Sequence, residues 1–227
     1  LCRRYVFQGD VMVKERVNPW LEKSIENILP LSISNEVSVA FSEWLFSGEV
    51  IDYGHVCVEC ELCEHDELRY HYKINNEFTN NSLWVGSSCI LRFEEIVVFN
   101  ENSEAVTSKD DRRKVLESAL KAKQIDISLE PLRSLWRVNF ERRDYIRYHA
   151  EEIKNNNSIS PDALNVLFTS LKDFNIDFKP ENYSVNLRDS FNQHQLLHMN
   201  EESQKLIWKT MSSQQRSKYK HKMKFKT

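Results

Sequence analysis

Three cysteines in the first half of the chain have the spacing of metal ligands. Cys60 and Cys63 are separated by two residues, so one tight turn can direct both sulfurs at the same ion. Cys89 follows an expected β-hairpin, which brings a third sulfur back beside that turn. Zn²⁺ prefers four tetrahedral ligands drawn from thiolate and imidazole groups. The sequence therefore predicts a structural zinc site that includes Cys60, Cys63 and Cys89.

The fourth ligand has three candidates. His65 lies two residues after the Cys60–Cys63 turn and can fold back over the ion, so it ranks first. Cys57 would complete a four-cysteine site, but in an extended segment its side chain and that of Cys60 point to opposite faces. His71 lies on the polar face of a predicted strand, where we expect it to be solvated. The predicted ligands are Cys60, Cys63, His65 and Cys89, with Cys57 and His71 as alternatives to His65.

A catalytic zinc site is a weaker interpretation of the same residues. His65-Asp66-Glu67 has the His-x-Glu pattern of zinc deaminases, but in those enzymes the cysteine pair follows the motif and comes after a proline. The sequence contains no phosphate-binding loop, no nucleophile elbow and no His-Glu-x-x-His motif. We therefore expect a protein without catalytic activity, and a metal-dependent nuclease is the weakest alternative.

The cysteine segment resembles a core found in poorly characterised proteins of bacteriophages, plasmids and related mobile elements. The resemblance lies in Cys60-Glu-Leu-Cys63, Leu68-Arg-Tyr70, Ile74-x-Asn76 and Leu83-Trp-Val-Gly-Ser-x-Cys89-Ile90. It covers about a sixth of the chain and implies a zinc-binding fold and an origin in a mobile element. It implies no reaction. Such proteins often have glycine after the second cysteine, where this chain has Glu64.

The elements that must position these residues predict an α+β fold. Residues 1–106 are expected to form an α+β domain whose β module, residues 50–99, contains the cysteines. In that module, alternation predicts a strand over residues 68–74 and a returning strand over residues 83–85. Residues 107–227 are expected to form a mainly helical domain with a basic tail. The expected helices cover residues 35–48, 108–123, 131–152, 188–198 and 201–223, and a further helix starts at Ser160-Pro161.

Charge is unevenly distributed, although the net charge is only −3. Residues 42–67 contain eight acidic residues and no lysine or arginine, whereas residues 210–227 contain six lysine or arginine residues and no acid. These segments could pair within one chain or between two copies of the chain. Basic residues interleaved with aromatic ones could instead bind phosphates. The candidate nucleic-acid contacts are Arg133, Arg137, Arg143 and Arg147, together with Lys218, Lys220 and Lys222.

Function is predicted only in outline. No apolar run is long enough to span a membrane and no signal peptide is evident, so we expect a cytoplasmic protein with no membrane partner. The favoured hypothesis is a zinc-stabilised, non-catalytic binding protein that engages a host or partner protein, for example as an inhibitor of a host enzyme or defence system. The alternative is a DNA- or RNA-binding regulator that uses the arginine helix and the lysine tail.

Overall fold

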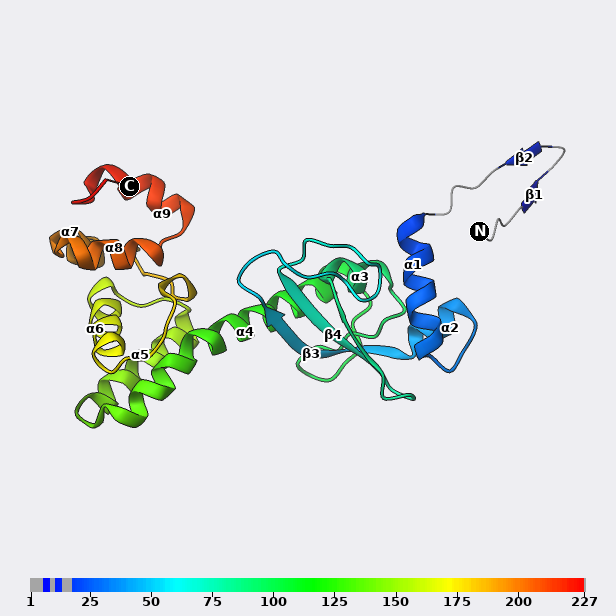
Figure 1. Ribbon diagram of the computed structural model, residues 1–227, viewed down its shortest axis with the longest axis horizontal. Coiled ribbons are helices and arrows are strands. Elements are labelled where there is room, and N and C mark those ends of the chain that lie inside the picture. The colour runs from blue at the N-terminus through cyan, green and yellow to red at the C-terminus, as the bar shows by residue number, and fades with distance from the viewer. Residues whose placement is uncertain (1–5, 9–10, 14–17, 227) are drawn as a thin grey trace. The chain divides into compact units, whose positions relative to one another are not determined.

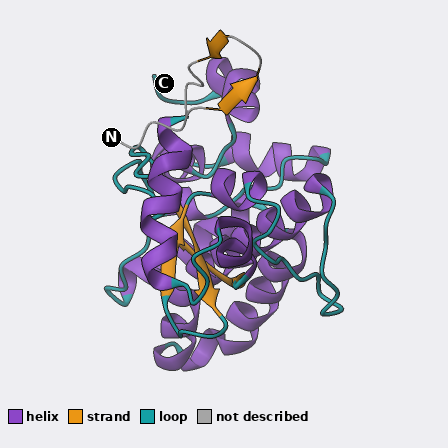
Figure 2. Cartoon of the chain, turned by 90° about the vertical axis from the view of Figure 1, so that its right-hand side faces the viewer, coloured by secondary structure: helices purple, strands orange, loops and turns teal. Residues whose placement is uncertain are grey.

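Helices and a small antiparallel sheet give the chain the α+β architecture that its sequence predicts. The computed structural model describes residues 6–8, 11–13 and 18–226; Figure 1 labels most of its helices and strands, and Figure 2 distinguishes helices from strands. The chain divides into two units, Leu1–Lys121 and Ala122–Thr227. Their boundary lies inside one long helix, α4 (Lys109–Val138), and so comes later than the expected division between residues 106 and 107.

A three-stranded antiparallel sheet forms the centre of the first unit. Tyr72 and Ile74 alternate with more polar residues and are buried in its core. The sheet has the order β3 (Trp44–Asp52), β4 (Tyr70–Asn76), β5 (Ser82–Val85). Tyr72 and Ile74 belong to β4, and β4 and β5 are the two strands of the predicted hairpin. The unit also contains the short hairpin β1 (Val6–Gln8) and β2 (Val11–Val13), the helices α1 (Pro19–Ile28), α2 (Val37–Ser42) and α3 (Ser87–Arg92), and the 3-10 turn η1 (Leu29–Leu31).

The predicted helix over residues 35–48 is wrong in its second half, because α2 ends early and Trp44 begins a strand. The carbonyl of Trp44 accepts a hydrogen bond from the N–H of Val97 at 2.8 Å, and the N–H of Phe46 donates to the carbonyl of Val97 at 2.9 Å. These bonds join residues far apart in the sequence, so local periodicity could not reveal them. Gly48, expected to end the helix, has φ 83° where the register of β3 and β4 shifts.

Glu43 is a buried carboxylate that joins separate segments of the first unit. It accepts hydrogen bonds from the backbone N–H groups of Ile33 and Ser34 and from the side-chain amide of Asn76, each at 2.8 Å. Burial opposes the ionisation of Glu43, but these three hydrogen bonds favour the charged form, and the pKa of Glu43 is lowered from its usual value. The carboxylate thus fixes the loop before α2 against the end of β4.

Arg112, near the start of α4, fastens that helix to α3. Its side chain is among the largest that are fully buried. The guanidinium donates hydrogen bonds to the carbonyl oxygens of Ile90, Phe93 and Glu94, at and just beyond the end of α3. Carbonyl groups at a helix C-terminus lack partners within the helix and carry partial negative charge, so a buried cation suits this position.

The second unit is helical and has its own core. Side-chain oxygens of Ser160, Asp189, Asn200 and Ser212 accept hydrogen bonds from the first turns of four helices, which fixes where each begins. In the described part of the chain, no helix combines the length and apolar character needed to cross a membrane. After α4 come η2 (Phe140–Arg142), α5 (Arg143–Asn156), α6 (Pro161–Asp173), η3 (Pro180–Asn182), α7 (Ser190–His198), α8 (Glu201–Lys209), α9 (Ser213–Tyr219) and η4 (Lys220–Lys222).

Two predicted helices of this unit have different limits. The helix expected to begin at Pro131 is the second part of α4, which continues through that proline. Proline costs a helix one hydrogen bond, but the adjacent Leu132 and Leu135 are buried in the core of the second unit and hold the helix there. The same predicted helix is interrupted at Asn139. The helix expected over residues 201–223 is divided into α8 and α9, because Ser212 starts a new helix with a capping box.

Replacing Arg112 with methionine should destabilise the first unit. The variant leaves buried carbonyl groups without donors, and we expect the free energy of unfolding to fall by about 3 kcal/mol. Arg113→Met is the matched control, because Arg113 is exposed and forms a surface ion pair with Asp110. Urea unfolding followed by circular dichroism measures both. Equal stability of the two variants would contradict the role assigned to Arg112.

Glu43 should make the stability of the first unit depend on acid pH. Its pKa is lowered on folding, so its contribution is complete above the pKa of an unfolded glutamate, about 4.3, and is lost as the pH falls through the folded value. We therefore expect Glu43→Gln to be less stable than the parent chain at pH 7, with the difference narrowing below about pH 4. Thermal unfolding over this pH range measures the difference. A gap that widens in acid would refute the assignment.

Candidate metal centre

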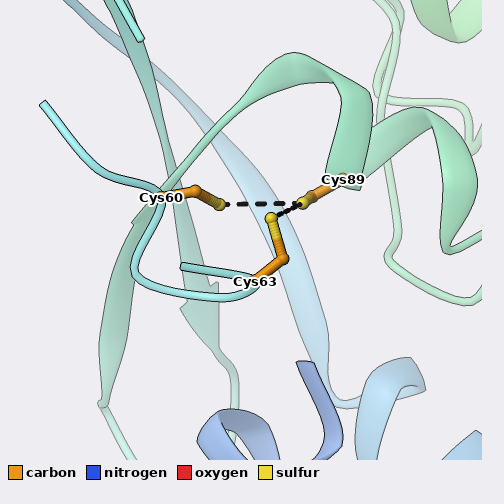
Figure 3. Close-up of side chains that lie close together, drawn as sticks. All are labelled: Cys60, Cys63 and Cys89. Carbon is orange, nitrogen blue, oxygen red and sulfur yellow. Dashed lines mark hydrogen bonds between the residues drawn. The ribbon is translucent and has the colours of Figure 1, made fainter. Parts of the chain in front are cut away.

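The three predicted cysteine ligands meet at one place in the first unit. The sulfur of Cys89 lies 3.3 Å from that of Cys63 and 3.6 Å from that of Cys60, and the three sulfurs lie within 4.8 Å of one another. Figure 3 shows the three side chains converging from the turn and from α3. All three residues are buried. The part of the chain that the structure describes thus contains the cysteine cluster that the sequence predicts.

The turn from Cys60 to Cys63 is held by its own backbone. The N–H of Cys60 donates to the carbonyl of His65, and the N–H of Glu64 donates to the carbonyl of Cys60, both at 2.8 Å. Glu64 has φ 56°, a left-handed conformation that glycine adopts more readily. The carboxylate of Glu64 is 3.3 Å from the Lys23 ammonium and forms an ion pair with it.

The approach of Cys89 depends on Gly86, which precedes α3. The N–H of Gly86 donates to the sulfur of Cys60 at 3.3 Å, and the N–H of Cys89 donates to the carbonyl of Gly86 at 3.0 Å. A side chain at position 86 would bring its Cβ to 3.2 Å from the Leu68 side chain. A larger residue at position 86 would therefore require the Leu68 side chain to shift.

The electrostatics of the cluster are asymmetric. The hydrogen bond with Cys89, aided by backbone N–H groups including that of Gly86, lowers the pKa of Cys60 to about 5. The same sulfur–sulfur contact, together with burial, raises the pKa of the Cys89 thiol, and burial raises that of Cys63. The surroundings therefore favour the thiolate form of Cys60 and oppose deprotonation of Cys63 and Cys89. A cation at the centre would offset this opposition, because a metal ion favours deprotonation of its thiol ligands.

The sulfur positions fit a tetrahedral ion. Zinc–sulfur bonds of about 2.3 Å place pairs of sulfurs about 3.8 Å apart. The Cys60–Cys89 separation of 3.6 Å is close to this value, and the Cys63–Cys89 separation of 3.3 Å is shorter. The three cysteines also line a cavity of about 170 Å³ together with His65 and Arg92. They are the residues that could hold a metal ion, and the donor set, three thiolates with one position left, suits zinc.

The three candidates for the fourth ligand lie in different surroundings. His65 is exposed and lines the cavity beside the cysteines, although its ring nitrogens lie outside the cluster of three sulfurs. Cys57 is exposed and does not line the cavity. The expectation that His71 is solvated is wrong: it is 5% exposed, with its ring nitrogens 3.3 Å from the Tyr53 hydroxyl and 2.9 Å from the Glu59 carbonyl.

Two residues of the cavity wall, Trp20 and Arg92, were not among the predicted site residues. The Arg92 guanidinium lies over the Trp20 ring, 4.8 Å from its centroid. Arg92 is three residues after Cys89 in α3, and helical residues at this spacing share a face. The spacing of Cys89 and Arg92 could therefore have predicted a positive charge near the cysteine sulfurs. Trp20 belongs to α1, far from the cysteines in sequence, so no spacing could have predicted its place in the cavity.

The four candidate arginines for nucleic acid differ in their contacts. Arg133 pairs with Asp126 and Glu130, and Arg147 pairs with Asp144. Arg143 lies over the rings of Trp136 and Phe140 and donates to the carbonyl oxygens of Trp136 and Arg137, at the end of α4. Arg137 is exposed. Three of the four are thus occupied by local pairing or helix capping.

The candidate lysines of the tail belong to α9 and η4. The ammonium groups of Lys218 and Lys222 lie over the Tyr219 ring, 5.3 and 5.7 Å from its centroid, and Lys220 is exposed. Tyr219 itself is buried. The tail also folds back on the second unit, where the Lys224 ammonium donates to the carbonyl of Met199. The basic segment is therefore a packed part of its unit.

Several acids of the 42–67 segment are also engaged within their own unit. Glu49 pairs with Lys73, and Asp52 pairs with Arg69. Glu61 accepts a hydrogen bond from the N–H of Trp84 at 2.6 Å. These contacts use part of the acidic charge that pairing between two copies would require. Self-association through the acidic and basic segments stays a prediction.

Comparison with known proteins adds no relative to this geometry. No protein-family model matches the chain, and no curated protein or solved structure matches it either.

The purified chain should contain about one zinc ion per molecule, and removing that ion should lower its melting temperature. Cys63→Ser should abolish stoichiometric binding, because it removes a buried ligand. If His65 is the fourth ligand, His65→Ala should weaken zinc affinity at least about tenfold. Cys57→Ser tests the alternative fourth ligand and should bind normally, because this exposed thiol does not line the cavity. Metal analysis and competition with a chelator give these values; full zinc content in Cys63→Ser would refute the site.

Proposed function

We propose that this chain is a non-catalytic binding protein whose first unit is braced by a structural zinc ion. The observation that carries the structural role is the burial of all three sulfurs in a cavity with no aspartate or glutamate among its described lining residues. A catalytic zinc needs an open position for water and normally a general base nearby. A buried thiolate set serves instead to close a fold, because the ion joins segments that the backbone alone does not connect.

The second unit supplies the surface that we assign to a partner protein. A groove of about 710 Å³ lies between the end of α4 and α6. Three apolar side chains on its walls are unusually open: Val138 is 46%, Phe140 70% and Phe174 43% exposed. Apolar side chains gathered around a groove are typical of protein interaction sites. The expected occupant is a segment of another protein that inserts apolar side chains between η2 and α6.

The resemblance of the cysteine segment to proteins of phages and plasmids supports a host protein as that partner. A protein from a mobile element acts inside a host cell, so a host protein is the natural target. We propose that the chain acts by occupying a host enzyme or defence protein.

The alternative, a DNA- or RNA-binding regulator, has less support from the contacts of its candidate residues. Arg133 and Arg147 already pair with acids, and Arg143 caps a helix. Surface ion pairs of this kind are weak, but they lower the charge available to phosphates. The protein partner is therefore favoured.

The groove can be tested with two matched phenylalanines. Phe140 lines the groove, whereas Phe191 on α7 is equally open, at 68%, and does not line it. We expect Phe140→Asp to lose at least about nine-tenths of partner capture, and Phe191→Asp to retain it, because a charge in the apolar groove opposes burial of the partner. Pull-down from the native host after nuclease treatment, followed by mass spectrometry, measures capture.

Two outcomes would contradict this proposal. Equal capture by both variants would remove the groove from the interface. Capture that disappears after nuclease treatment, and that Arg137→Glu weakens, would instead support the nucleic-acid alternative.

A further inference from the structure

A second cavity of the helical unit collects positive charge from several elements. It encloses about 750 Å³ between the extended segment 183–188, the turn from α8 to α9 and the end of α5. Four basic side chains line it, and Glu181 is the one acidic residue among the described residues of its wall. The four are Arg188, Lys209, Arg216 and Lys218. This volume is within the range of small-molecule sites.

Most of that positive charge is not neutralised within the unit. The Lys209 ammonium is 3.7 Å from the Glu181 carboxylate, which is the single ion pair that the four form with described residues. Arg216 donates to the carbonyl oxygens of Trp208 and Lys209, each at 3.1 Å, which leaves further N–H groups of its guanidinium for a ligand. The guanidinium of Arg188 forms no hydrogen bond or ion pair with any described residue. An anion would therefore meet a net positive wall.

Two tyrosines provide an independent indication of a ligand. Tyr183 and Tyr219 both line the cavity, and each is more than nine-tenths buried. Neither hydroxyl oxygen has a hydrogen-bond partner among the described residues. Burial raises the pKa of Tyr183, so its hydroxyl keeps its proton and can act as a donor. Buried polar groups are normally satisfied, so two residues that line one basic cavity and carry hydroxyls without a partner are candidates to donate to a ligand that enters it.

We propose that this cavity binds a phosphate-bearing ligand. Arginine and lysine provide charge-assisted hydrogen bonds to phosphate oxygens, and tyrosine hydroxyls add neutral donors. The phosphate belongs either to a free nucleotide, which matches the volume of the cavity, or to the backbone of a single nucleic-acid strand. This site is independent of the zinc cluster and of the groove assigned to a partner protein.

Calorimetric titration of the full chain with three probes tests the site: inorganic phosphate, adenosine monophosphate and a short single-stranded oligothymidylate. We expect at least one probe to bind, with affinity that falls as salt rises, and Arg188→Gln to weaken that binding at least about tenfold. Lys205→Gln is the matched control. Lys205 is a cation on α8 that pairs with Glu201 and does not line the cavity, so its replacement should change affinity less than about twofold.

Tyr183→Phe separates ligand binding from folding, because it removes one hydroxyl and keeps the ring. We expect this variant to bind the probe several-fold more weakly while its melting temperature without ligand is unchanged or higher. Binding of the mononucleotide assigns the cavity to a small ligand, and binding of the oligonucleotide alone assigns it to a strand. Absence of binding by all three probes, or equal weakening by Arg188→Gln and Lys205→Gln, would overturn the proposal.

Discussion

Three thiolates cannot share a buried space of this size without a cation, and this electrostatic constraint applies to the cysteine cluster of the first unit. Like charges a few ångströms apart repel strongly where water is excluded. Without an ion, the cluster has to remain largely protonated, and the opposed pKa shifts of Cys60 and Cys89 express that conflict. With an ion, all three sulfurs become ligands and the conflict disappears. A bound cation would thus allow a charge state of the cysteines that protein atoms alone do not stabilise.

The consequence of this cluster extends into the rest of the first unit. Cys89 lies on α3, and Arg112 holds the carbonyl groups at the end of the same helix. A short helix of this length has little stability of its own, so it depends on being fixed at both ends. The sulfurs fix it near its start, and the buried guanidinium fixes its end and joins it to α4. A metal ion held by the cysteines would therefore be coupled to the packing of α4 through the short helix α3.

The parts of the fold that were predictable depend on short-range signals. Cys60 and Cys63 define a turn by their spacing alone, and Ser160 followed by proline marks the start of α6 through capping. Trp44 could not be assigned by the same means, because its strand is formed by bonds to β4 and to Val97. His71 was placed on a solvated face because strand alternation describes direction only. Its burial comes from Tyr53 and Glu59, which pack over that face of the sheet.

The charged residues illustrate the same limit at the level of function. The spacing of Arg143 and Arg147 predicts a basic ridge on one helix face. In the structure Arg143 donates a hydrogen bond to a carbonyl at the end of α4, and Arg147 pairs with Asp144. Positive charge accumulates instead where Arg188, Lys209 and Lys218 meet, although they come from three separate segments. Spacing in sequence detects a site when one element supplies the ligands, as in the cysteine turn. When several elements supply them, the packing of the fold decides which charges remain available for a ligand.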